Sequence, residues 1–281
     1  MVAIFALAAA GLYGTADFLG GAASRRTSAL AVLSVTASVG LVVAIIAALV
    51  AGGPFRLAGF WWAAAGGAAG GVGLIAFYAG LAVGPMSVVA PVSALVSTVL
   101  PVGVAVAQGE RPGPAVVVGA VICLVAITLV SMEGSRSGPG RRPPVRGLGY
   151  GLAAGLGFGL FFLFLRDAGT SGVLWPVAES RLAGVVIAVA AAAATRTRPL
   201  WWGADRRGFT MALASGLFDA TANACYVLAT RTGLFGLAVV ITSLYPGITV
   251  LLARLTLGER MRSVQRAGLA LAAVGIILIT A

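Results

Sequence analysis

The stretch Gly73–Met132 recurs as Ala222–Ala281 at a constant offset of 149 residues (222 minus 73). Both copies carry Gly-Glu-Arg at the same point, in a short polar gap between two apolar runs. Most other aligned positions pair one apolar residue with another. A duplicated apolar block of this length indicates a membrane protein built from two related halves. The identical pairs include Gly84/Gly233, Leu95/Leu244, Gly109/Gly258, Glu110/Glu259, Arg111/Arg260 and Gly119/Gly268.

The composition supports a membrane location. Hydrophobic residues make up 60% of the 281 residues, charged residues 10%, and the mean hydropathy is +1.04. A soluble domain carries about 25% charged residues. The length suits about ten spans of roughly 20 residues each, so we expect a multi-pass protein of the cell (inner or plasma) membrane. Met1–Gly21 lacks a basic leader segment and is interpreted as a retained first helix.

Two missing residue types restrict the chemistry. The sequence contains no histidine, and all 19 basic residues are arginine. This removes the P-loop lysine of an ATPase, Schiff-base chemistry and a histidine-based triad or metal site. We therefore expect no enzyme activity, no catalytic residue, no metal and no cofactor. The net charge of +11 lies in the gaps between apolar runs, which is a membrane-topology pattern and not a nucleic-acid surface.

The apolar runs predict an all-α integral membrane fold with ten transmembrane helices. Residues 1–132 form a first five-helix repeat, 133–146 a linker rich in Gly, Pro, Ser and Arg, and 147–281 a second five-helix repeat. The predicted helices cover about 2–22, 29–51, 60–82, 86–107, 114–132, 147–165, 173–194, 208–230, 234–257 and 263–281.

An odd number of spans per repeat makes the second copy enter the membrane from the opposite side. The halves are then an inverted repeat, the geometry that alternating access uses. Of the 19 arginines, 14 fall in the odd-numbered loops and four in the even-numbered loops, with Arg181 inside a span. The positive-inside rule places the odd loops in the cytoplasm and both termini outside.

Two sequence stretches carry a family resemblance. Leu12-Tyr13-Gly14-Thr15-Ala16-Asp17-Phe18, and Leu244-Tyr245-Pro246 through Gly258-Glu259-Arg260, resemble the first and ninth helices of the EamA repeat of the drug/metabolite transporter superfamily. The resemblance implies ten transmembrane helices, a central cavity between the halves and secondary transport, commonly export of small metabolites. It also implies cytoplasmic termini, the reverse of the arginine count, and it leaves the substrate open.

Charged residues inside the spans are candidates for function, because burying a charge in the bilayer is costly. Asp17, Glu179 and Asp219 are the three carboxylates in such positions. Asn223 and Tyr226 follow Asp219 at i+4 and i+7, so the three share one helix face.

Tyr13 and Asp17 share a face of the first span in the same way. We expect these two polar faces to line the cavity and bind the substrate, with Tyr245 of the ninth span nearby. Proton coupling would use Asp219 or Asp17, since a low-dielectric site favours the neutral carboxyl group.

Structural alternatives remain open for each candidate. Arg181 is either a counter-ion that neutralises Asp219 or an anion-binding group. Asp17 could form a purely structural hydrogen bond to a neighbouring helix, and Glu179 could pair with a loop arginine. The Gly-Glu-Arg turns are interpreted as structural, with Glu110 and Glu259 capping or pairing at helix ends. The glycines of 66–73 and 155–159 are expected at tight helix contacts.

The sequence therefore predicts a secondary active transporter, an exporter of a small metabolite or drug-like solute. Its partners would be that solute and the lipid bilayer, and it would act as a monomer or homodimer. Alternatives are an intramembrane aspartyl protease using Asp17 and Asp219, and a non-transporting scaffold or channel subunit. Substrate, direction and coupling ion stay open, although the candidate residues favour a neutral, zwitterionic or cationic solute over a polyanion.

Overall fold

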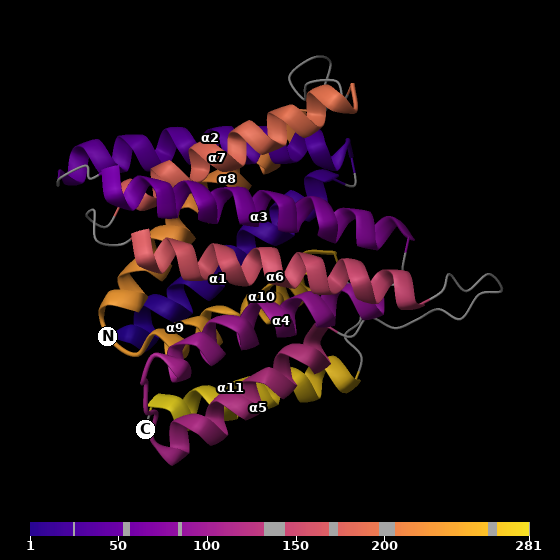
Figure 1. Cartoon of the computed structure of the whole chain (residues 1–281). Coiled ribbons are helices and arrows are strands. Elements are labelled where there is room, and N and C mark those ends of the chain that lie inside the picture. Colours follow the sequence, from indigo (N-terminus) through magenta and orange to yellow (C-terminus); the bar gives the residue numbers. More distant parts are fainter. Residues whose placement is uncertain are drawn as a thin grey trace.

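A computed structural model describes residues 1–24, 26–52, 57–83, 86–131, 144–168, 174–196, 206–257 and 263–280. Within these ranges the chain forms eleven α-helices and no strand (Figure 1). The helices are α1 Val2–Ser24, α2 Ala29–Ala51, α3 Leu57–Val83, α4 Met86–Ala107, α5 Pro114–Ser131, α6 Pro144–Ala168, α7 Trp175–Ala194, α8 Arg206–Arg231, α9 Phe235–Thr242, α10 Tyr245–Leu257 and α11 Ser263–Thr280.

The helices have the length and surface of membrane spans. Six are long and apolar enough to cross a bilayer, namely α1, α2, α3, α6, α7 and α8, and shorter apolar helices cover the rest of the described bundle. Large apolar side chains such as Val42, Ile46 and Ile277 are more than half exposed. An exposed apolar surface of this kind suits lipid and not water. The chain is an integral membrane protein whose described elements are all helices.

Two helix boundaries differ from the sequence-based expectation. Helix α6 begins at Pro144, inside the expected linker, because proline is favoured in the first turn of a helix. The ninth apolar run divides into α9 and α10 at Ser243 and Leu244. There the Gly247 N–H donates to the Leu244 carbonyl over 2.9 Å. Pro246 has no N–H, so it cannot continue the regular helical ladder.

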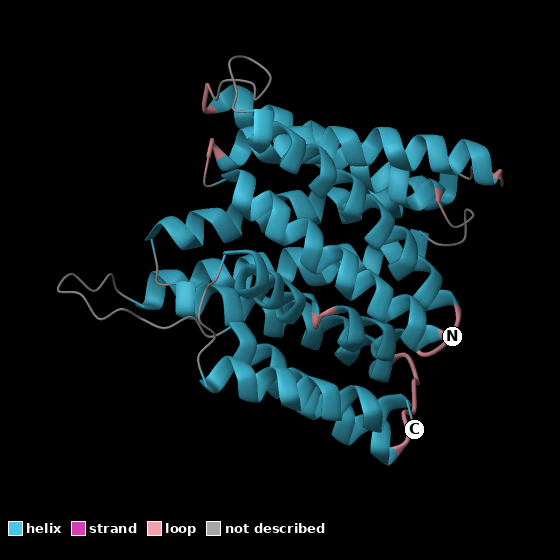
Figure 2. Ribbon diagram, turned by 180° about the vertical axis from the view of Figure 1, so that it is seen from behind, coloured by secondary structure: helices cyan, strands magenta, loops and turns pink. Residues whose placement is uncertain are grey.

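Helices from the two halves pack against one another in matched pairs. In chain order, α1 to α5 of the first half correspond to α6, α7, α8, α9 with α10, and α11 of the second. The contact of α1 with α8 therefore corresponds to that of α6 with α3, and the contact of α1 with α9 and α10 corresponds to that of α6 with α4. Helix α2 contacts α8 as α3 contacts α7, while α2–α7 and α5–α11 join equivalent helices. Both chain ends lie at the same end of the bundle (Figures 1 and 2). We call this the termini end and its opposite the distal end.

Glycines allow the closest of these contacts. A Cβ atom on Gly157 of α6 would lie 2.6 Å from the Gly73 Cα of α3. A Cβ on Gly14 of α1 would lie 2.7 Å from the Tyr245 carbonyl oxygen of α10. The expectation of tight glycine contacts within 66–73 and 155–159 is therefore confirmed, since lipid-embedded helices approach where side chains are smallest.

The first Gly-Glu-Arg turn ends α4 and caps another helix. Gly109 has a φ of 95°, and the N–H groups of Gly109 and Glu110 donate to Val106 and Ala105 over 3.0 Å each. This is a Schellman motif, which requires a left-handed residue after the helix. The Glu110 carboxylate accepts hydrogen bonds from the first two N–H groups of α9, so its predicted capping role is confirmed. Glu259 lies outside the described residues.

Candidate functional site

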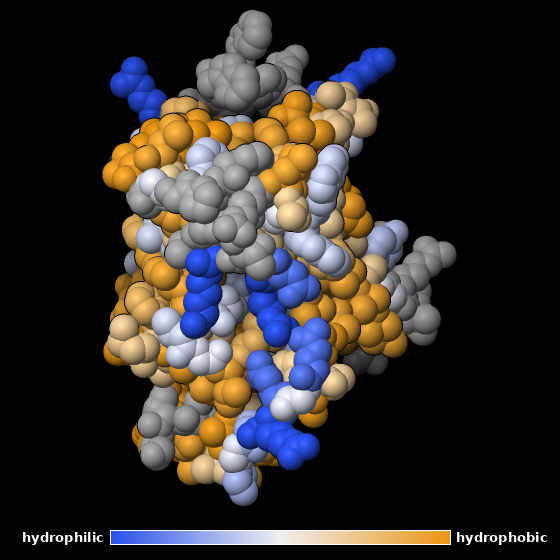
Figure 3. All heavy atoms as spheres, turned by 60° about the vertical axis from the view of Figure 1, so that its left-hand side comes forward, coloured by the Kyte–Doolittle hydropathy of each residue, from blue (hydrophilic) through white to orange (hydrophobic). Residues whose placement is uncertain are grey.

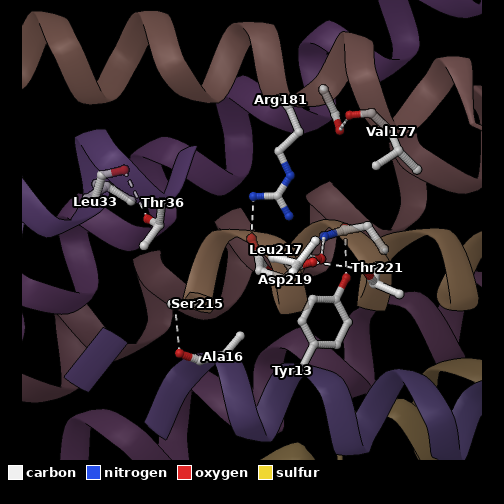
Figure 4. A network of polar contacts seen from close by, with 12 residues as sticks. Tyr13, Ala16, Leu33, Thr36, Val177, Arg181, Ser215, Leu217, Asp219 and Thr221 are labelled. Carbon is white, nitrogen blue, oxygen red and sulfur yellow. Dashed lines mark hydrogen bonds and ion pairs between the residues drawn. The ribbon is translucent and has the colours of Figure 1, made fainter. Parts of the chain in front are cut away.

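A hydrogen-bonded pair joins α1 to α8 in the interior of the bundle (Figure 4). The Tyr13 hydroxyl donates to Asn223 Oδ1 over 2.7 Å, and Asn223 Nδ2 donates to the Asp219 carbonyl oxygen over 2.7 Å. Tyr13 is 8% exposed and Asn223 1%. Because each polar group is buried with a partner, the pair fixes how α1 lies against α8.

An ion pair joins α7 to α8 beside it. Arg181 Nη1 pairs with Asp219 Oδ2, and Figure 4 shows the guanidinium reaching from α7 toward that carboxylate. The Arg181 side chain is 15% exposed and that of Asp219 28%. A Cβ on Gly40 would lie 3.5 Å from Arg181 Nη1, so α2 passes close to the pair. Arg181 is therefore the counter-ion of Asp219, one of the two roles that the sequence left open.

Asp17 lies near this pair but has no partner of its own. No described residue hydrogen-bonds or pairs with its carboxylate, which lies within electrostatic range of Asp219 and Tyr245. The residue is exposed, whereas Tyr13, one turn earlier on the same face of α1, is buried. Since α1 runs from the termini end, the buried Tyr13 lies nearer that end and the exposed Asp17 lies nearer the distal end.

Aromatic rings close the buried side of the cluster. The Phe162 ring lies 6.5 Å from Tyr13 and 4.8 Å from Tyr226, measured between ring centroids. The Tyr245 ring lies 6.1 Å from that of Tyr13. Tyr226 also donates its hydroxyl proton to the Phe162 carbonyl oxygen over 3.1 Å. The aromatic layer fills the space between α1, α6, α8 and α10.

The sequence analysis did not include Phe162 among the candidate site residues. One signal was available. Phe162 follows Gly155 by seven residues, so the two share a face of α6. A Cβ on Gly155 would lie 2.7 Å from the Ser93 carbonyl oxygen of α4, which places this face against the interior.

Glu179 stands apart from the cluster. It is 4% exposed, and neither carboxylate oxygen has a hydrogen-bond partner within the part of the chain that the structure describes. The alternative that Glu179 pairs with a loop arginine is therefore not found among the described residues. Glu179 lies two residues before Arg181 and so on a different side of α7. The structure thus brings together seven of the eight predicted site residues, and the exception is Glu179: the group is Tyr13, Asp17, Arg181, Asp219, Asn223, Tyr226 and Tyr245.

The cluster is thus a group of polar side chains held between the apolar helices of a membrane protein. Residues 145–281 match the EamA-like transporter family. This part of the chain therefore belongs to the EamA-like transporter family, whose domain characterises the drug/metabolite transporter superfamily.

A solved structure supports the fold over the whole chain. It is described only as the crystal structure of a protein, and it superposes with a TM-score of 0.80 at 17% identity. The alignment covers 99% of this chain and 96% of that one. At this identity the likeness shows the fold alone. No curated protein matches the sequence closely enough to count as a relative.

Proposed function

We propose that this protein is a secondary active transporter that exports a small cationic or zwitterionic solute in exchange for protons. Ten spans carry this activity, α9 and α10 together forming the ninth. The matched helix pairs between α1–α5 and α6–α11 support an inverted repeat, because the most extensive contacts between the halves have counterparts when the two halves are exchanged. Such halves interconvert inward-open and outward-open states by exchanging conformations.

The charge balance of the central cluster is the observation from which we infer a cationic or zwitterionic solute. Asp17, Asp219 and Arg181 are two carboxylates and one guanidinium. Arg181 neutralises Asp219, so one negative charge on Asp17 is left without a partner among the described residues. An uncompensated charge at this depth is costly. A bound ammonium group or a bound proton would remove that cost, and the two would compete for Asp17.

The aromatic side chains supply the rest of the site. The faces of Tyr13 and Tyr245 attract cations through their ring quadrupoles, and the Tyr245 ring lies 6.1 Å from that of Tyr13 beside the accessible carboxylate. A polyanion would meet an excess of negative charge here. The same charge arrangement counts against an intramembrane aspartyl protease, since Arg181 holds Asp219 in an ion pair and two catalytic carboxyls must share a proton.

Transport by proteoliposomes under an imposed pH gradient tests the proposal. The substrates would be radiolabelled primary amines, amino acids and neutral sugars. We expect an amine or amino acid to accumulate with the gradient, and Asp17→Asn to reduce this accumulation at least tenfold. Asp167→Asn, which removes an exposed charge at the end of α6, is the matched control and should leave transport unchanged. Movement of sugars alone, or full activity in Asp17→Asn, would refute the proposal.

A further inference from the structure

The first half of the chain is fastened to the second at the termini end by the Glu110 side chain. Glu110 Oε1 accepts a hydrogen bond from the Phe235 N–H over 2.7 Å. Glu110 Oε2 accepts one from the Gly236 N–H over 3.0 Å. Both oxygens of one carboxylate are thus used by the first two amides of α9, a helix of the opposite half. A carboxylate at a helix N-terminus also interacts favourably with the helix dipole.

Arg166, at the end of α6, makes further contacts with both α9 and α4 at the termini end. Its guanidinium carbon lies 4.4 Å from the centroid of the Phe235 ring. Its Nη1 atom donates to Gln108 Oε1 over 2.6 Å. The end of α4, the end of α6 and the start of α9 therefore meet in one group of five residues, which we call the latch: Gln108, Glu110, Arg166, Phe235 and Gly236.

The latch covers the buried side of the candidate site. Beneath it along α9, Val239 is fully buried and belongs to the same apolar cluster as Tyr13, Tyr226 and Phe162. Toward the distal end, by contrast, Asp17 is accessible. The latch therefore lies on the buried side of the site, and the exposed Asp17 lies on the side nearer the distal end.

The latch contacts are suited to reversible opening. The hydrogen bonds of Glu110 are only partly buried, and that of Arg166 is exposed. When they break, water can hydrate the carboxylate and the guanidinium, so opening does not strand a charge in lipid. Figure 3 brings the termini end forward and shows hydrophilic residues gathered in a band between apolar surfaces.

We propose that Glu110 is a gating residue, and that release of α9 from its carboxylate opens the termini end during transport. The inference rests on the proposed transport function, since a gate has a purpose only where a solute passes. It also gives the Gly-Glu-Arg turn a part in the conformational cycle: Gly109 ends α4 in the geometry that aims Glu110 across the boundary between the halves.

Cysteine accessibility in the purified full-length protein tests the gate. With Cys123 and Cys225 replaced by Ala, Val239→Cys places a thiol beneath the latch. We expect Glu110→Gln to raise the rate at which a bulky polar maleimide labels this thiol by about tenfold, because the charge-assisted bonds to α9 are weakened. Arg111→Gln removes a neighbouring exposed charge of the same turn and should leave the rate within about twofold.

A second variant covers the case in which Glu110→Gln fails to fold. A Cβ on Gly236 would lie 3.3 Å from Glu110 Oε2, so Gly236→Ala disturbs the latch while keeping the carboxylate, and it should also speed labelling. Lower thermal stability without faster labelling would make Glu110 a purely structural cap and overturn the proposal. The assay uses no solute and no gradient, so its failure is distinct from a failure of transport in the Asp17→Asn experiment.

Discussion

At the scale of single residues, the Arg181–Asp219 pair makes a specific prediction. Arg181→Gln leaves the Asp219 carboxylate between helices without its counter-ion, and we expect it to lower the free energy of unfolding by roughly 2 kcal/mol. The effect is moderate because Asp219 is 28% exposed. Thermal unfolding in detergent measures it, with the exposed Arg111→Gln as the matched control.

The double variant Arg181→Gln/Asp219→Asn separates charge from packing. Asp219→Asn removes the stranded carboxylate and should recover most of the lost stability. If the double variant is as unstable as Arg181→Gln alone, then the packing of the arginine side chain, and not its charge, stabilises α7 against α8.

Residue spacing predicted which side of a helix faces the interior, but it did not predict which side chains of other helices contact that side. The i+4 and i+7 positions of Asn223 and Tyr226 correctly placed both on the inner face of α8 with Asp219. The partner of Tyr13 lies 210 residues away along the chain, and no local pattern encodes that distance. For the same reason the sequence could not distinguish whether Arg181 is the counter-ion of Asp219 or an anion-binding group. It also could not show that Glu179 has no partner among the described residues.

At the scale of helices, the α1–α10 contact depends on one glycine. A Cβ on Gly14 would lie 2.5 Å from Ile248 Cβ, which the close approach of the two helices does not allow. We expect Gly14→Ala to cost about 1–3 kcal/mol of stability through overpacking. It should also slow transport, because it displaces Tyr245 from the site.

Gly11 is the matched control on the same helix. Nothing lies within 4 Å of a Cβ built there, so Gly11→Ala should be neutral, or stabilising by up to about 1 kcal/mol through helix propensity. Thermal unfolding and transport rates compare the two variants. Equal effects at Gly11 and Gly14 would show that helix propensity, and not the α10 contact, governs α1.

Helix extents were largely readable from the sequence, because apolar length alone decides what can cross a bilayer. The break between α9 and α10 was not, since Ser243 and Leu244 are both compatible with a continuous span. Pro246 was the available signal. The capping of α9 by Glu110 was only half predicted. The duplicated turn indicated a helix cap, but a contact between halves 125 residues apart requires the tertiary fold.

At the scale of the whole molecule, the helix packing is symmetric between the halves, whereas the charged residues of the candidate site are not. The helix pairings repeat between the halves, as a mechanism with two interconvertible states requires. The charges of the candidate site do not repeat: at the 149-residue offset Arg181 corresponds to Val32 and Asp219 to Gly70, and Asp17 corresponds to a residue of opposite charge, Arg166. In the proposed transport cycle the repeated scaffold would provide the movement, and the unrepeated residues would provide the selectivity.

Orientation in the membrane is the remaining whole-molecule prediction. The described arginines at the termini end are few, such as Arg111 and Arg231, whereas Arg196, Arg206 and Arg266 lie at the distal end. The positive-inside rule then places the distal end in the cytoplasm. Asp17 would be loaded from the cytoplasm, as export requires, and the latch would close the outer side.

Reporter fusions decide this orientation. Alkaline phosphatase, which is active only outside the cytoplasm, should be active when fused after Ala281, and green fluorescent protein at that position should be dark. Truncation after Arg196, at the distal end of α7, should reverse both signals and serves as the internal control. A fluorescent fusion after Ala281 would place the latch on the cytoplasmic side. The accessible Asp17 would then face outward, and the proposed cycle would start from the opposite state.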